Sequence, residues 1–412
     1  MAVWEFNRGE WTEAYVFLRL LGDGRIYGAS ADLVKDEQTY IDIINIIRDE
    51  PDKCLIFERF VKDEVVCVQS YKNGEKLKII TAPELSEKAA FLYEKIKNIT
   101  TGDRKIKVPE IQEYLESISI NSPKANLSSK AKEKYGAKTD IIVTTEDSFD
   151  HVRTIGGFSI KSHIGSNPTL FNCSQSSGFV YRITGCDVEG MHRLNSKGGF
   201  LDIMSTIKKN YSLEYAGCRN ELFEQNICIV DSRMDEILQN AMLIHTGYFE
   251  GLGSSNMSEM CSALSLLNPI GVSNPYIFYE AKLKAFLFAS FAGMTASTEW
   301  NGRKKLTGGY IDVDREGDLL YYRAISDDIF ENYLFRHTYF DRPDRGVNKE
   351  LAVQEAKAHI NENRALTDEE KKKLIYKNGV DGTKNSKKGD FGYVYQADKE
   401  FYIAINFQIR FR

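Results

Sequence analysis

Two neighbouring strand-like segments, residues 139–145 and 153–161, constrain the fold of this chain more than any other feature. Both are rich in β-branched and apolar residues, and the short acidic turn between them is typical of a hairpin of adjacent strands. Helical and strand-like patterns alternate on either side of the pair. We therefore expect an α/β (α+β) fold, in which helices flank a mixed sheet.

The predicted hairpin places residues that are suited to phosphodiester hydrolysis close together. Asp140 begins the first segment, and in the second Phe158 and Ile160 alternate with Ser159 and Lys161, which therefore share a face. A carboxylate at the mouth of a buried strand suits Mg²⁺, which binds one or two carboxylates and keeps several waters. A positive group can stabilise the charge that develops on the phosphate. This is the layout of a D…(D/E)xK nuclease motif, except that a serine replaces the usual acid.

A serine brings no negative charge, so the second carboxylate must come from elsewhere. Residues 7–21 have apolar side chains at helical spacing, and Glu10 and Glu13 lie near the start of this predicted helix. We expect Glu13 to act, with Glu10 as the second choice; the alternative for either is a solvated acid favoured by the helix dipole. The predicted catalytic residues are Asp140, Lys161, Glu13, Glu10 and Ser159, and the predicted metal site comprises Asp140, Glu13 and Ile160.

Polar and basic side chains beyond the hairpin are candidate DNA contacts. Serine and asparagine form hydrogen bonds without adding charge, and arginine reads guanine with two hydrogen bonds. The alternative for each of them is an ordinary surface loop. The candidates are Ser162, His163, Ser166, Asn172, Arg303, Lys304, Arg336 and His337. The lysine-rich stretch 119–138 is either a solvated connector or a phosphate-contacting loop.

Composition excludes several other classes of protein. The formal net charge of -5 argues against a protein that coats DNA through bulk charge, although a basic cleft can still bind it. The 7 cysteines are scattered without a CxxC pair, so reduced thiols are expected rather than a zinc site. There is no secretion signal and no apolar run of membrane-spanning length, which predicts a cytoplasmic protein with no membrane partner.

The length of 412 residues favours two lobes, and the pattern changes near residue 300 to short β-like segments. We expect residues 1–300 to form a nuclease core with insertions, including the basic connector 119–138 and the catalytic hairpin 139–163. Residues 301–412 would form a C-terminal lobe that contains β-strands and serves DNA recognition or dimerisation. Within this lobe the charged stretch 347–378 is predicted to be helical.

Two sequence blocks carry a resemblance to a known family. Residues 7–15, and residues 157–166 followed by 169–172, resemble signature blocks of the HpaII-type restriction endonucleases, of the PD-(D/E)xK nuclease superfamily. The resemblance covers roughly the first 200 residues, and the loop at 336–338 loosely. It implies a type II restriction endonuclease that uses Mg²⁺ to hydrolyse double-stranded DNA at a short palindrome, with CCGG as the implied site, and leaves 5′-phosphate ends.

The resemblance also implies residue roles and partners. Asp140 would bind Mg²⁺, Glu13 or Glu10 would complete the metal site, and Lys161 would orient the attacking water. A homodimer would match a two-fold symmetric site, and a DNA methyltransferase would be the genetic partner. Two alternatives stay open: a catalytically inactive DNA-binding protein, and a structure-specific repair or junction nuclease. A helical glutamate beside Asp140 would favour an enzyme.

Overall fold

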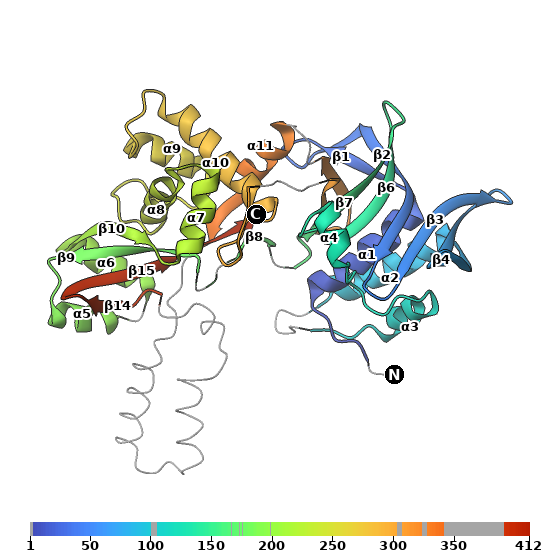
Figure 1. Cartoon of the computed structure of the whole chain (residues 1–412), viewed down its shortest axis with the longest axis horizontal. Helices are drawn as coiled ribbons and strands as arrows, with labels where there is room; N and C mark the ends of the chain where they lie inside the picture. Colours follow the sequence, from blue (N-terminus) through green and yellow to red (C-terminus); the bar gives the residue numbers. More distant parts are fainter. Residues whose placement is uncertain are drawn as a thin grey trace, which may run out of the picture.

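The chain forms two lobes that meet at a narrow junction (Figure 1). The computed structural model describes residues 3–99, 105–165, 167–172, 174, 176–197, 199–302, 307–323, 328–341 and 391–412. We use "first lobe" for residues 3–165 with 307–323, and "second lobe" for residues 167–302 with 328–341 and 391–412. A separate hydrophobic core fills each lobe.

The first lobe is built on one mixed sheet. Its strands are β1 (Arg25–Ala29), β2 (Lys35–Asp49), β3 (Cys54–Lys62), β4 (Val65–Lys72), β5 (Glu75–Thr81), β6 (Ile141–Asp147), β7 (Arg153–Ser162), β11 (Gly309–Val313) and β12 (Leu319–Arg323). They pair in the order β1-β12-β11-β7-β6-β2-β3-β4-β5. Because β1 also pairs with β2, the six strands from β1 to β2 close into a ring. β1 with β12 and β7 with β11 are parallel, which confirms the expected mixed sheet.

Four helices of the first lobe accompany this sheet: α1 (Arg8–Asp23), α2 (Ala82–Lys97), α3 (Pro109–Ser117) and α4 (Ser129–Tyr135). Helix α1 begins with a capping box, in which the side chain of Asn7 accepts a hydrogen bond from the Glu10 amide and the Glu10 side chain accepts one from the Asn7 amide. It ends at Gly24, whose φ of 76° suits a residue without a Cβ. Its apolar face, with Trp11 and Leu18, is fully buried, as the helical spacing predicts.

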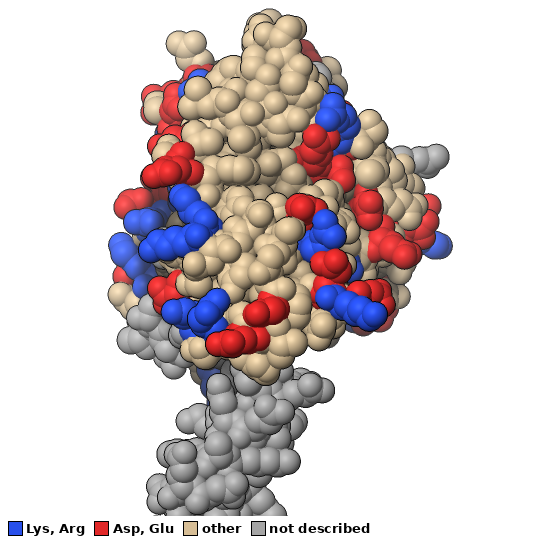
Figure 2. Space-filling view, turned by 90° about the vertical axis from the view of Figure 1, so that its left-hand side faces the viewer, with Lys and Arg blue, Asp and Glu red and all other residues tan. Residues whose placement is uncertain are grey.

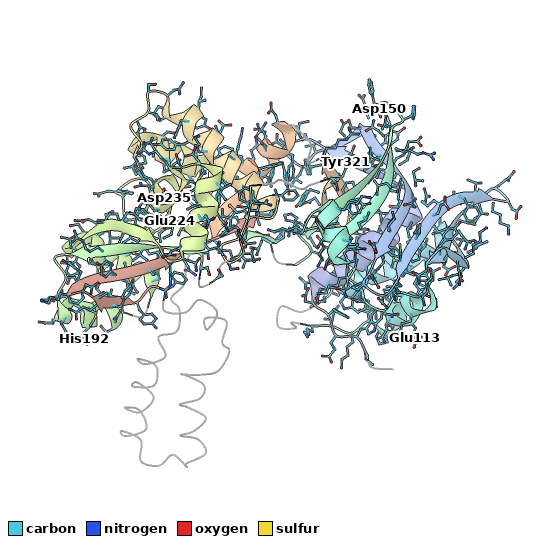
Figure 3. All side chains as sticks on the ribbon, in the orientation of Figure 1. Glu113, Asp150, His192, Glu224, Asp235 and Tyr321 are labelled. Carbon is cyan, nitrogen blue, oxygen red and sulfur yellow. The ribbon has the colours of Figure 1, made fainter. Side chains whose placement is uncertain are left out.

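The predicted hairpin of two adjacent strands is confirmed. Strands β6 and β7 are antiparallel, with Ile141 opposite Phe158. The acidic turn that joins them projects to the outer edge of the lobe, where Asp150 lies (Figure 3). Phe158 and Ile160 are buried in the core of the first lobe, so the predicted alternation along β7 is also correct.

The second lobe combines helices with two small sheets. The helices are α5 (Val188–Asn195), α6 (Phe200–Asn210), α7 (Glu221–Val230), α8 (Met234–His245), α9 (Met257–Leu267), α10 (Pro275–Phe291) and α11 (Asp328–His337). The strands are β8 (Thr169–Phe171), β9 (Gly178–Thr184), β10 (Ser212–Cys218), β13 (Thr338–Asp341), β14 (Val394–Ala397), β15 (Glu400–Asn406) and β16 (Gln408–Phe411). One sheet has the order β10-β9-β15-β14 and the other β13-β16-β8. The expected strands near the C-terminus are thus present.

The hydrogen-bonded sheets do not follow the predicted division at residue 300. Strands β11 and β12 belong to the sheet of the first lobe, whereas β15 pairs with β9 in the second. The reason is topological: a parallel pair such as β7 and β11 needs a long crossover, and most of the second lobe is inserted there. The stretch 347–378, together with Ser166, Arg303 and Lys304, lies outside the described residues.

Basic and acidic side chains are mixed on the end of the second lobe that faces away from the first (Figure 2). A surface of mixed sign does not attract a polyanion strongly, so this end is a poor candidate for DNA binding. Across the described residues, no helix combines the length and the apolar character that crossing a membrane demands.

Candidate active site

A cleft of about 340 Å³ opens where the first turns of α1 approach the ends of β6 and β7. It brings together six predicted residues from the N-terminal helix and the β6–β7 hairpin: Glu10, Glu13, Asp140, Ile160, Lys161 and Ser162. Asn7, Arg8, Gly9, Ile164 and Pro168 complete its lining. A larger cavity of about 510 Å³ lies at the other end of α1. Two of its acids are already neutralised by arginines there, in Arg25–Asp42 at 2.7 Å and Arg19–Asp23 at 2.9 Å, so the smaller cleft is the better candidate for catalysis.

Asp140 is held at the base of the cleft by hydrogen bonds from β7. Its Oδ2 accepts a hydrogen bond of 2.7 Å from the amide of Ile160 and one of 3.2 Å from the hydroxyl of Ser159. Burial raises the pKa of Asp140, and the charge of Lys161 and these hydrogen bonds offset that effect only in part. Ser159, which is 3% exposed, occupies the position where the motif usually has an acid. Its hydroxyl donates to Asp140 and thereby orients the carboxylate.

Glu13 is the carboxylate of the cleft that interacts electrostatically with Asp140. Burial and then the negative charge of Asp140 raise the pKa of Glu13 to about 8, so the two carboxylates lie close enough to repel each other. A divalent cation between them would relieve this repulsion, and the pair therefore fits one. Among the described residues, no group of three or more His, Cys, Asp and Glu side chains is arranged to hold a metal. The site thus offers two carboxylates, and any further ligands would be backbone oxygens or waters.

Glu10 is engaged in other contacts. Its Oε2 accepts the amide of Asn7 at 3.0 Å, and its Oε1 accepts the ammonium of Lys124 at 2.6 Å. Burial raises the pKa of Glu10, but these two hydrogen bonds outweigh it and leave the pKa below its ordinary value. The buried Arg48 in turn donates 2.7 Å to the carbonyl oxygen of Lys124 and so fixes this segment beside α1. The two glutamates therefore have different electrostatic surroundings, and Glu13 is the one affected by Asp140.

Two lysines approach Asp140. Lys161 extends from β7 into the cleft, and its charge favours the ionised form of Asp140. Lys138, which the sequence analysis did not select, donates 2.9 Å to the carbonyl oxygen of Ser290 in α10. Burial and then the charge of Lys161 lower the pKa of Lys138 to about 8. Its position directly before the catalytic strand was the sequence signal that could have identified it.

Comparison with known proteins agrees with this geometry. The sequence profile of the HpaII restriction endonuclease matches residues 7–363 of the chain. The chain belongs to the HpaII restriction endonuclease family. It is therefore a type II site-specific deoxyribonuclease that acts on DNA, and the resemblance of its two sequence blocks is confirmed. Type II restriction enzymes generally use divalent metal ions, and the Glu13–Asp140 pair is consistent with that requirement.

One relative of this endonuclease is the type II restriction enzyme HpaII of Haemophilus parainfluenzae. The two sequences are 28% identical over 410 residues, which is 98% of each chain. No solved structure matches the chain. The similarity to this relative thus extends well beyond the first 200 residues, which contain the two sequence blocks.

The structure corrects one predicted DNA contact. His163 is 6% exposed, and its Nε2 lies 3.1 Å from Oδ1 of Asp312. Its backbone amide donates 2.8 Å to Val313, so hydrogen bonding with β11 continues past the assigned end of β7 and draws the side chain inside. His163 therefore contacts the protein interior, and its burial argues against the predicted contact with DNA.

The other described candidates lie on surfaces or in contacts between segments. Ser162 lines the cleft, and its hydroxyl lies 3.4 Å from that of Thr12. Asn172 is exposed. On α11, which had been expected to be a loop, Arg336 donates 2.9 Å to Asp32 and the ring of His337 lies 2.9 Å from the carbonyl oxygen of Ala31. These two side chains hold the β1–β2 loop against the second lobe.

Proposed function

We propose that this endonuclease hydrolyses both strands of double-stranded DNA at a short palindrome in a Mg²⁺-dependent reaction that leaves 5′-phosphate ends. The observation that carries the proposal is the cleft in which Glu13, Asp140 and Lys161 meet. CCGG is the proposed site because the resemblance to the HpaII-type enzymes implies it. A homodimer, a cognate methyltransferase and a cytoplasmic location belong to the same proposal.

Each residue of the cleft has a proposed role. Glu13 and Asp140 would hold Mg²⁺, and Ile160, whose side chain has no ligand atom, would contribute its backbone carbonyl oxygen. Bound Mg²⁺ would polarise the scissile phosphate and lower the pKa of a water molecule. Ser159 keeps Asp140 oriented, since its hydroxyl donates to the carboxylate. Lys161 would orient the attacking water and stabilise negative charge on the phosphate as the bond breaks.

DNA contacts are proposed around this cleft. Ser162 and Asn172 follow the catalytic strand and can form hydrogen bonds with the backbone or with base edges. Helix α4, in the lysine-rich connector, lies on the side of the first lobe toward the second (Figure 1). Its lysines are exposed and would contact phosphates: Lys130, Lys132 and Lys134. The segment 301–412, with Arg303, Lys304, Arg336 and His337, would contribute to recognition or dimerisation.

The structure bears differently on the two alternative functions, a catalytically inactive DNA-binding protein and a structure-specific nuclease. Repulsion between Glu13 and Asp140 is evidence of a carboxylate pair, which a catalytically inactive DNA-binding protein does not need. A structure-specific nuclease would use the same carboxylates, and it differs from a restriction enzyme only in its substrate. The test must therefore compare DNA sequences with DNA structures.

The experiment is a cleavage assay of the purified protein on unmethylated phage DNA, with Mg²⁺ or with EDTA. Matched substrates are the same DNA methylated at CCGG, and nicked and four-way-junction DNA. Discrete fragments that need Mg²⁺ and have ends at CCGG would support the proposal, and methylation would abolish them. Cleavage of junctions alone would favour the structure-specific nuclease, and fragments with other ends would replace CCGG by the mapped sequence.

A further inference from the structure

A buried polar cluster lies where the two lobes meet. The carboxylate of Asp312, on β11, is 1% exposed. Its Oδ1 accepts hydrogen bonds from the hydroxyls of Tyr310 at 2.7 Å and of Tyr333 at 3.0 Å, and lies 3.1 Å from Nε2 of His163. A buried carboxylate is costly unless hydrogen bonds compensate it, and here three groups converge on one oxygen atom. The four side chains are thus a single unit.

The cluster is connected to the catalytic strand. Lys161 is the register partner of Asp312 across the parallel β7–β11 pair, and His163 follows Lys161 by two residues. The amide of His163 donates to the carbonyl oxygen of Val313, while its ring contacts Asp312. The end of β7 is therefore attached to β11 through both backbone and side chain, immediately beyond Lys161.

The cluster is also connected to the second lobe. Tyr333 belongs to α11, and its ring stacks on Tyr322 with ring centroids 4.4 Å apart and on His337 with centroids 5.1 Å apart. Phe411, from the C-terminal strand, packs against His163 with centroids 6.3 Å apart. Displacement of α11 would therefore change the hydrogen bonding of Asp312 and, through His163, the end of β7.

Aromatic side chains form the rest of the contact between the lobes, so a buried polar cluster there needs a separate explanation. Phe291 and Phe330 pack on Tyr310, with ring centroids 5.7 and 5.8 Å away. Apolar side chains in place of a buried ionic pair often give equal or greater stability, whereas buried polar groups can specify one arrangement of packed elements. A need for one particular register of β7 on β11 explains the cluster better than a need for stability.

We propose that His163 is a positioning residue for DNA cleavage: with Asp312 and Tyr333 it aligns the end of β7, and hence Lys161, and makes this alignment depend on the second lobe. The inference rests on the proposed role of Lys161. Recognition of the correct DNA sequence by the second lobe would reach the cleavage site through Tyr333. His163 itself touches neither DNA nor metal.

The experiment compares His163→Gln, which keeps an N–H donor, with His163→Leu, which does not. Single-turnover cleavage with Mg²⁺, DNA binding with Ca²⁺ and thermal unfolding are measured for each variant. We expect His163→Leu to cleave about 100-fold more slowly with binding within about threefold of wild type, because small misalignments of reacting groups have such effects. His163→Gln should recover most of the rate. His245→Leu, at a partly buried histidine of the second lobe that packs on Phe340, is the matched control and should cleave normally.

A second variant keeps the test decisive if His163→Leu does not fold. Tyr333→Phe removes one hydroxyl that the second lobe supplies, and we expect it to lower the ratio of cleavage rates between the correct site and a site with one base changed. Wild-type rates and wild-type discrimination in folded variants would overturn the inference, and so would parallel losses of binding and cleavage. An active Lys161→Ala variant would overturn the proposed function instead, so the two failures are distinguishable.

Discussion

Two partly buried acidic side chains, Glu13 in the first lobe and Asp231 in the second, have opposite electrostatic surroundings. In the first lobe Glu13 is partly buried beside another carboxylate, and burial and this neighbour raise the pKa of Glu13 to about 8. In the second lobe Asp231 is also partly buried, but Lys282 lies 2.5 Å away. Burial raises the pKa of Asp231, and the hydrogen bond from Lys282 with its charge outweighs it, so the pKa ends below its ordinary value.

This difference indicates where the chemistry resides. An unfavourable carboxylate pair persists when a ligand or a reaction needs it, whereas a paired acid contributes to the fold. Glu224 and Asp235, also in the second lobe, lie among its helices and away from the cleft (Figure 3). We therefore expect substitutions in the cleft of the first lobe to affect cleavage, and substitutions in the core of the second lobe away from Tyr333 to affect stability.

The largest expected effect is on cleavage in the first lobe. Lys161→Ala removes the cation that would stabilise the developing charge, and we expect a rate loss of about 1000-fold or more with little change in unfolding temperature. Lys130→Ala, in the exposed face of α4, is the matched control and should lower the cleavage rate far less. Single-turnover rates at saturating enzyme measure both, and equal losses in the two variants would contradict the assignment.

The second-largest expected effect is a loss of folding stability after a substitution in the core of the second lobe. Phe407 is buried and stacks on Phe171 and Phe179, with ring centroids 5.2 and 5.6 Å away. Phe407→Ala should lower the free energy of unfolding by about 3–5 kcal/mol, because it leaves a cavity in a packed core. Urea unfolding measures this loss. At low temperature, where the variant remains folded, its single-turnover cleavage rate should match the wild type; a selective loss of cleavage would break the distinction between the lobes.

A smaller effect should appear in the pH dependence of stability without metal. The pKa of Glu13 is about 8 in the folded chain and 4.5 ordinarily, so between these pH values the folded chain retains a proton that the unfolded chain releases. Stability in EDTA should therefore fall as the pH rises from 5 to 8. Thermal unfolding should show a shallower fall for Glu13→Gln than for wild type. An identical pH dependence in both proteins would show that Glu13 is not buried beside Asp140.

The smallest effect is expected for a surface pair between the lobes. Arg336 lies 2.9 Å from Asp32, and about half of each side chain or more is exposed. Exposed ion pairs contribute about 1 kcal/mol or less, so Arg336→Ala should lower the free energy of unfolding by no more than that. A double-mutant cycle with Asp32→Ala measures the interaction free energy between Arg336 and Asp32. A larger loss of DNA binding than of stability would support the predicted role of Arg336 in recognition.

The β6–β7 hairpin was predictable because its signals are local. Alternation along β7 and the apolar run of β6 are encoded within a few residues, and the turn between them is short. The pairing of β15 with β9 could not be derived in this way, since Ile403 and Tyr181 are more than 200 residues apart in the sequence. Insertion of the second lobe between β7 and β11 likewise has no local sequence signal, so the division at residue 300 did not anticipate the sheets.

Contacts between residues distant in the sequence also decide the features of the site that the sequence left open. Glu10 and Glu13 lie within one turn of a helix, and contacts with Lys124 and Asp140, both more than 100 residues further on, distinguish them in the fold. His163 follows a strand as a polar loop residue would, and its burial depends on Asp312 and Tyr333, which are far away in sequence. The sequence therefore predicted which types of side chain form the site. It could not predict which of the two glutamates lies beside Asp140, or that His163 is buried, because both depend on tertiary contacts.

We propose that Glu13, and not Glu10, shares the metal with Asp140. The most direct measurement is the single-turnover cleavage rate as a function of Mg²⁺ concentration for wild type, Glu13→Gln and Glu10→Gln. We predict that Glu13→Gln lowers the maximal rate by about 100-fold and needs more Mg²⁺, while Glu10→Gln stays within about tenfold at an unchanged Mg²⁺ requirement. The opposite ranking, or a Mg²⁺ dependence that neither variant changes, would contradict the account.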